Sequence, residues 1–168
     1  MILFIGHISA GYITTKGILK ILSHRNTEHL RPGHVLFWGL IGSVLPDFDI
    51  LYFYLIDNRQ HLHHGYWTHI PLFWCAIFSL IFLFSFAFQR ISLRVCTLVC
   101  AINVFLHLFL DTIVGKIRWL YPFSDQDFVF FHVPSVHDWW VWNFVFHWTF
   151  LFEIALMLIA VYIIAKRN

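Results

Sequence analysis

The chain has 168 residues and a formal net charge of +2; 60% of its residues are hydrophobic and 12% are charged. An ordinary soluble domain carries roughly 25% charged residues, so this composition excludes a typical soluble fold and predicts an integral membrane protein. Once the apolar segments are subtracted, no room is left for a separate soluble domain. Residues 1–168 are therefore expected to form one domain, an all-α membrane bundle in which any catalysis comes from the bundle itself.

A membrane crossing takes about 20 mostly apolar residues, which predicts four to five spans. The first two segments are imperfect. Residues 1–22 contain a histidine and two lysines and are expected to form a tilted or partly submerged helix, and residues 35–56 are interrupted by a proline and two aspartates. Three later segments predict clear spans: residues 70–88, 95–113 and 143–165.

Lysine and arginine favour the cytoplasmic side of a membrane, so their distribution predicts the orientation of the chain. With five spans, eight of them fall on one side and three on the other. This predicts a cytoplasmic C-terminus and places the polar residues described below toward the outer leaflet. The larger set is Lys16, Lys20, Arg25, Arg31, Arg90, Arg94, Lys166 and Arg167, and the smaller set is Arg59, Lys116 and Arg118.

The longest connection, residues 115–143, is aromatic throughout. Tryptophan and tyrosine favour the membrane interface, so this segment is interpreted as an interfacial anchoring belt. A second interpretation is an apolar rim that admits a lipid tail. Both interpretations can hold together.

The three cysteines, Cys75, Cys96 and Cys100, lie within predicted spans and are expected to be small core residues without a disulfide framework. Cys100 is about 10 Å along the helix from His107, too far to share one metal ion with it. Asn103 lies between them on the same face. It is expected to join helices, with a hydrogen bond to a metal ligand as the alternative.

His107 and Asp111 are one helical turn apart in an apolar segment. Ionisable groups are costly at that depth, so the default interpretation is functional. The spacing brings an imidazole and a carboxylate to one point, which suits zinc or a similar divalent ion. The alternative is a hydrogen-bonded pair between helices.

Two further groups supply the same chemistry. Pro46 is expected to break its helix and to place Asp47 and Asp49 in the first turn of a new segment, where the helix dipole favours carboxylates. At least one aspartate is expected to bind the metal; both would do so only with an irregular backbone or with two ions. His64 and His69 flank a short turn that can bring two imidazoles together, with a polar role at the interface as the alternative.

Four motifs occur in order: LPDFD at residues 45–49, HGYWTH at 64–69, HLFLDT at 107–112 and WLYPFS at 119–124. They resemble the LPDxD, HRGxTHS, HLxLDxxT and WPFS elements of the LexA-regulated, metal-dependent hydrolase family of bacterial inner membranes. The resemblance covers most of the chain and implies a multi-pass inner-membrane hydrolase with a divalent metal. The positions it assigns to the metal are His7, Asp47, Asp49, His64, His69, His107 and Asp111.

The chain departs from the family pattern at three places. The HRG element reads HHG, and of its two histidines, His63 and His64, the second keeps the spacing to His69 and is preferred as the ligand. Ile70 replaces the usual serine, and Tyr121 interrupts the WPFS element. These departures affect the ligand set more than the family resemblance.

A more distant similarity is to zinc-dependent phospholipase C, which implies hydrolysis of a phosphoester. The His-xxx-Glu helix of that three-metal pattern is absent, because Leu151 follows His147 by four residues and Glu153 is out of register. One or two metal ions are therefore expected.

These residues predict a mechanism. A zinc ion, with manganese as the alternative, is expected to lower the pKa of a bound water toward about 7. Asp47 or His64 is the candidate catalytic general base, or would hold a second ion. The expected substrate is a membrane lipid or lipid-linked phosphate; no nucleic-acid partner is expected, and no oligomeric state is predicted. The expected zinc ligands are Asp49, His69, His107 and Asp111.

Three other functions use similar residues. A divalent-metal transporter also places aspartate and histidine in spans, but it more often has paired half-helices and polar groups in both leaflets. A membrane di-iron oxygenase has clustered histidine boxes, which this chain lacks. A purely structural metal site in a non-enzymatic scaffold is the third alternative.

Overall fold

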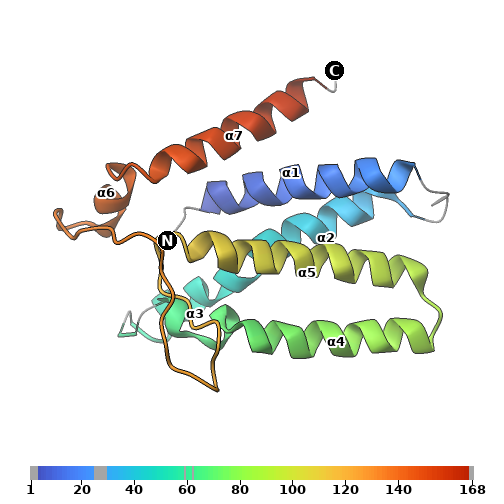
Figure 1. Ribbon diagram of the computed structural model, residues 1–168, viewed down its shortest axis with the longest axis horizontal. Helices are drawn as coiled ribbons and strands as arrows, with labels where there is room; N and C mark the ends of the chain where they lie inside the picture. Colours follow the sequence, from blue (N-terminus) through green and yellow to red (C-terminus); the bar gives the residue numbers. More distant parts are fainter. Residues whose placement is uncertain (1–3, 25–29, 59, 62, 167–168) are drawn as a thin grey trace.

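The computed structural model describes residues 4–24, 30–58, 60–61 and 63–166. Over these residues the regular structure is helical apart from a single isolated β-bridge after the fifth helix (Figure 1). The predicted all-α class is therefore confirmed. The α-helices are α1 (Phe4–Ser23), α2 (Pro32–Val44), α3 (Asp49–Leu55), α4 (Pro71–Ala87), α5 (Ile91–Asp111), α6 (Trp140–Val145) and α7 (Phe150–Ala165), and the 3₁₀ helices are η1 (Pro46–Phe48), η2 (His63–Gly65) and η3 (Trp67–His69).

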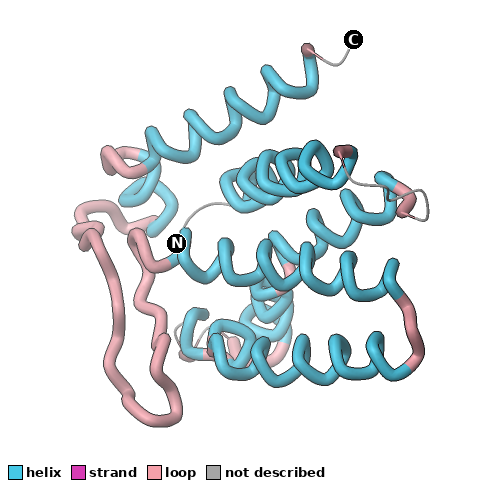
Figure 2. The backbone as a smooth tube through the Cα atoms, turned by 45° about the vertical axis from the view of Figure 1, so that its right-hand side comes forward, coloured by secondary structure: helices cyan, strands magenta, loops and turns pink. Residues whose placement is uncertain are grey.

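Helix α5 lies at the centre of the bundle. Helices α1, α2 and α4 all pack against it, and α7 packs on α1 (Figures 1 and 2). One apolar cluster joins α2 to the first half of α5 through Val35, Cys96 and Val99. A second joins α4 to the other half of α5 through Trp74 and Leu108. The apolar core therefore follows the length of α5.

Helix α2 approaches its neighbours closely because glycines lie at the contacts. A Cβ atom added at Gly42 would collide with the backbone carbonyl of Cys100 on α5, and one added at Gly39 would collide with Thr15 on α1. Small residues permit this close packing between membrane helices. The buried Asn103 of α5 adds an interhelical hydrogen bond, from its Nδ2 to Oγ1 of Thr15 at 3.1 Å. This contact agrees with the predicted role of Asn103 in joining helices.

Helix length identifies fewer membrane spans than predicted. Among the described residues, α5 is the one helix long and apolar enough to cross a membrane alone. Helix α2 and the segment Pro46–Leu55 pass the same criteria together, but they meet at a bend of 57°. Helices α4 and α7 are apolar but have only 17 and 16 residues. The prediction of four to five spans is therefore not confirmed.

The predicted span at residues 143–165 is wrong in its first part. Helix α6 ends at Val145 and α7 begins only at Phe150. Between them, Nδ1 of His147 and Oγ1 of Thr149 are 2.8 Å apart, within hydrogen-bond distance. Local hydrogen bonding by polar side chains competes with a continuous helix, which accounts for the break.

The outer surface of the bundle is apolar. Phe84 on α4 and Phe123 in the aromatic connection are both exposed. Cys96 and Cys100 are buried as predicted, whereas Cys75 on α4 is exposed, and the expectation of a core residue there is wrong. Helix α4 packs chiefly against α5, so much of its circumference faces outward.

Candidate metal centre

Five of the seven residues assigned to the metal lie at or near the ends of four helices. His7 lies near the start of α1, Asp47 follows the end of α2, His69 lies two residues before the start of α4, and His107 and Asp111 lie at the end of α5. Figure 1 shows these helix ends together at one end of the bundle. Residues far apart in the sequence therefore meet because four helices begin or end at the same level.

The break after α2 follows from its sequence. Pro46 cannot continue a regular helix, and α2 ends at Val44. A 3₁₀ turn, η1, then leads into α3, which begins at Asp49. This confirms the predicted interruption and turns Asp47 and Asp49 in different directions.

Four side chains form the cluster that could hold one metal ion: Asp47, His69, His107 and Asp111. Each offers one ligand atom, and these atoms all lie within 4.8 Å of one another. Nε2 of His107 is 3.1 Å from Oδ2 of Asp111 and 3.6 Å from Oδ1 of Asp47. Nε2 of His69 is 3.5 Å from Oδ2 of Asp111 and 3.8 Å from Oδ1 of Asp47. Tetrahedral zinc with bonds of about 2.0–2.1 Å separates its ligand atoms by roughly 3.3 Å. The cluster therefore has nearly the size of a zinc site.

Hydrogen bonds on the far side of each imidazole point the ligand nitrogens inward. Nδ1 of His107 is 2.8 Å from the backbone oxygen of Ser43. A carbonyl oxygen can only accept, so Nδ1 carries the hydrogen and Nε2 keeps its lone pair for the centre. Nδ1 of His69 is 2.8 Å from Oδ2 of Asp49, which acts on His69 in the same way.

Asp49 therefore lies behind His69 instead of at the centre, where the sequence led us to expect it as a ligand. The hydroxyl of Thr68 donates to the same Asp49 oxygen. Nε1 of Trp74 donates to the backbone oxygen of Thr68 at 2.7 Å, which anchors this turn to α4. The structure gives Asp47 the central position and Asp49 an orienting one.

His7 and His64 approach Asp111 from two further directions. Nε2 of His7 is 3.4 Å from Oδ1 of Asp111, and its ring stacks on that of His107 with centroids 3.8 Å apart. Nε2 of His64 is 3.6 Å from Oδ2 of Asp111. Gly115 leaves the space for His64, because a Cβ atom there would collide with its ring. The side chain of His63, the alternative ligand, lies outside the described residues.

The centre is almost fully buried, and its polar atoms fit a cation. His7, His69 and His107 are each 1% exposed and Asp111 is 0% exposed. Within the described part of the chain, Nε2 of His7, Nε2 of His107 and both carboxylate oxygens of Asp111 make no hydrogen bond. Buried polar groups without hydrogen bonds are costly unless they bind a metal. The residues present therefore fit a divalent ion with nitrogen and oxygen ligands.

Because Asp47 lies at the centre and Asp49 lies behind His69, substitution of the two residues should have different effects. Asp49→Asn should weaken zinc affinity by about 10- to 100-fold, as expected for a residue that orients a ligand, with full occupancy recovered at saturating zinc. Competition with a chelating indicator measures both quantities. The control is Asp125→Asn, because Asp125 is 86% exposed and is not among the cluster residues. Permanent loss of zinc from Asp49→Asn would instead make Asp49 a ligand.

Sequence reasoning missed the groups that orient the ligands. The oxygen that holds His107 belongs to the backbone of Ser43, and no residue type encodes a backbone contact. Thr68 could have been singled out from the sequence, because it lies beside His69 within the HGYWTH motif. Its role became clear only from its hydrogen bond to Asp49.

The fold and the site define a helical membrane protein with a buried aspartate–histidine cluster able to hold a metal ion. The chain belongs to the YdjM inner membrane protein family, whose model matches residues 1–168. No curated protein and no solved structure matches the chain significantly. Membership of this family supports the predicted location in the inner membrane.

Proposed function

We propose that this inner-membrane protein is a divalent-metal-dependent hydrolase that cleaves an ester, preferably a phosphoester, of a membrane lipid or lipid-linked substrate. The observation that carries the proposal is the carboxylate of Asp111, which faces four imidazole Nε2 atoms at 3.1–3.6 Å. Such a mixed set of nitrogen and oxygen ligands suits zinc, with manganese as the alternative.

The chain's own residues would hold and orient the ion. When bound, a divalent cation supplies Lewis acidity and activates water near neutral pH. Asp47, His69, His107 and Asp111 provide the ligand atoms. The carbonyl of Ser43 keeps His107 in the tautomer that binds.

His64 is the best-placed general base. Its side chain is 11% exposed, whereas those of His7, His69 and His107 are fully enclosed. An imidazole that contacts Asp111 and still reaches solvent can take a proton from water and release it. Asp47, the other candidate base, is already part of the four-residue cluster.

The proposed orientation places the metal centre toward the outer leaflet and the C-terminus in the cytoplasm. Lys20 lies in the last turn of α1, Arg31 immediately precedes α2, and Arg90 lies between α4 and α5. Figure 1 shows the end of α1, the start of α2, the α4–α5 connection and the end of α7 away from the end that holds the metal centre. Positive charge concentrated at that end supports a cytoplasmic location for it.

The test is hydrolysis of phospholipids and lipid phosphates by the purified full-length protein loaded with zinc or manganese. We expect release of phosphate or headgroup that is lost on chelation and restored by added metal. His64→Gln should lower kcat by about a hundredfold or more, the contribution of a general base, while the metal content stays unchanged.

A structural metal site is the second candidate, and the burial of all four cluster residues favours it. Chelation distinguishes the two functions. For an enzyme, activity should disappear before the helices unfold. Unfolding on metal removal, with no hydrolysis of any lipid tested in the loaded state, would support the structural function.

A further inference from the structure

We infer that the pocket beside the metal centre binds the headgroup of a phosphate-bearing amphiphile, with Arg118 as the principal anion-binding residue. The inference rests on the proposed function, because it names the substrate class of that same site. Its support comes from the position, charge and lining of the pocket.

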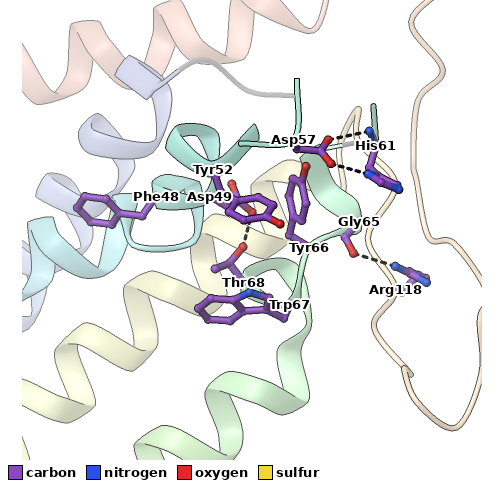
Figure 3. A pocket seen from close by; sticks show the side chains of 10 residues that line it. All are labelled: Phe48, Asp49, Tyr52, Asp57, His61, Gly65, Tyr66, Trp67, Thr68 and Arg118. Atoms are coloured by element: carbon purple, nitrogen blue, oxygen red, sulfur yellow. Dashed lines mark hydrogen bonds and ion pairs between the residues drawn. The ribbon is translucent and has the colours of Figure 1, made fainter. Parts of the chain in front are cut away.

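The pocket has a volume of about 680 Å³, which is within the range of small-molecule sites. It lies among η1, α3, the η2 and η3 turns and the beginning of the aromatic connection (Figure 3). Figure 3 places Phe48 and Arg118 at opposite ends of the pocket. Between these ends lie Asp49, Tyr52, Tyr66, Trp67 and Thr68.

One wall of the pocket is also a wall of the metal centre. Asp49 and Thr68 line the pocket. Oδ2 of Asp49 is 2.8 Å from Nδ1 of His69, one of the four cluster residues. The pocket and the metal centre therefore share Asp49, whose carboxylate orients a metal-binding imidazole.

Asp57, which also lines the pocket, already has hydrogen-bond partners within the chain. Asp57 accepts hydrogen bonds from the backbone N–H groups of Gln60 and His61 at 3.0 Å, and its Oδ1 is 2.7 Å from Nδ1 of His61. Burial acts to raise the pKa of Asp57, but the interactions with His61 and Tyr66 together outweigh it and lower the pKa to about 2.

Arg118 supplies the positive charge at the pocket. Its Nη2 donates to the backbone oxygen of Gly65 at 3.1 Å, and its guanidinium lies 5.1 Å from the ring centroid of Tyr121. Arg118 also forms an ion pair with Asp125, which is 86% exposed, but the 4.0 Å between Nη1 and Oδ1 is beyond hydrogen-bond distance. Arginine has five N–H donors in a fork that fits a phosphate, so donors remain for a ligand.

The other lining residues suit an acyl chain. Phe48 and Trp67 are 53% and 58% exposed, although both line the pocket. Phe48 immediately precedes α3, and Trp67 lies four residues before α4, whose outer surface is apolar. An amphiphile with its phosphate at Arg118 and its tail across Phe48 and Trp67 matches both ends of the pocket.

The test measures binding by the zinc-loaded, full-length protein in a non-ionic detergent, with native mass spectrometry as the readout. The three probes are short-chain phosphatidylglycerol, a diacylglycerol with the same tails but no phosphate, and glycerol 3-phosphate, which has no tails. We expect the first to bind at least about tenfold more tightly than the others. Arg118→Gln should weaken its binding roughly tenfold or more, as the loss of a charged hydrogen bond predicts.

Lys116→Gln is the matched control, because Lys116 is 56% exposed, pairs with Asp127 and does not line the pocket. It should leave phosphatidylglycerol binding unchanged. Equal losses in the two variants would mean that general surface charge attracts the lipid, and would overturn the inference. Equally tight binding of diacylglycerol would remove the phosphate requirement, and equally tight binding of glycerol 3-phosphate would assign the pocket to soluble phosphates; either result overturns it.

Zinc content separates this inference from the proposed function. Arg118→Gln should keep its zinc, because Arg118 is not among the four cluster residues. Arg118-dependent binding without hydrolysis of any lipid would contradict only the proposed function. Metal-dependent hydrolysis with binding that does not depend on Arg118 would contradict only this inference.

Discussion

Asp111→Asn is expected to abolish stoichiometric binding of a divalent metal while the helical bundle persists. Oδ2 of Asp111 faces Nε2 of His64, His69 and His107 at 3.1–3.6 Å, and Oδ1 faces His7 at 3.4 Å. Asparagine has the same size as aspartate, but its amide offers one oxygen instead of two and carries no charge. The loss of affinity should therefore exceed the roughly 10- to 100-fold that follows loss of an orienting residue. Elemental analysis of the detergent-purified protein measures the metal content.

The matched control is Asp127→Asn, which removes an aspartate of the aromatic connection that pairs with Lys116 at 3.8 Å. It should bind as much metal as the unsubstituted protein. Circular dichroism and size-exclusion chromatography report whether each variant is folded. Full metal content in folded Asp111→Asn would contradict the assigned centre. His107→Gln, which removes a second cluster residue, should give the same loss of metal.

Gly42→Ala is expected to destabilise the bundle more than any other single-methyl addition on α2. The added Cβ would collide with the backbone carbonyl of Cys100, which cannot rotate away as a side chain can. Forced separation of packed elements typically costs about 1–3 kcal/mol. The adjacent Ser43 holds His107, so separation of α2 from α5 should weaken metal binding as well. Thermal unfolding in detergent, with and without zinc, measures both effects.

Gly17→Ala is the matched control for that substitution. Nothing lies within 4 Å of a Cβ atom at Gly17, which is exposed on α1. Alanine is favoured over glycine in a helix by about 1 kcal/mol, so this variant should be as stable as the parent or more so. Equal stability of Gly42→Ala and Gly17→Ala would contradict the close packing of α2 on α5.

The parts of the site that depend on local backbone geometry could be predicted from the sequence. His107 and Asp111 are four residues apart on one helix, and this spacing alone brings them together. Pro46 has no backbone N–H to donate, and α2 ends beside it as expected. In both cases the physical cause acts within one turn of the chain.

The parts that depend on tertiary contacts could not be predicted. Asp47 and Asp49 have the same chemistry and lie two residues apart, so only their directions distinguish them. Those directions depend on how η1 and the first residue of α3, Asp49, meet η3, where Asp49 contacts His69. Arg118 counted in the sequence only toward membrane orientation, because its position at the pocket depends on a hydrogen bond to Gly65, 53 residues away.

Helix ends were also difficult to place from hydropathy. The segment at residues 143–165 is apolar on average, yet His147 and Thr149 interact with each other where a helix was expected. A hydropathy average takes no account of such local competition for hydrogen bonds. The break at Pro46 was predicted, but its angle of 57° was not, and this bend changes how the segment can cross a membrane.

X-ray absorption at the zinc edge, on zinc-loaded protein in detergent, tests the central claim most directly. The structure predicts about one tightly bound ion with nitrogen and oxygen ligands at about 2.0–2.1 Å and scattering from at least two imidazoles, His69 and His107. Absence of bound zinc after loading, or a sulfur ligand at about 2.3 Å from a cysteine such as Cys100, would contradict the assigned centre.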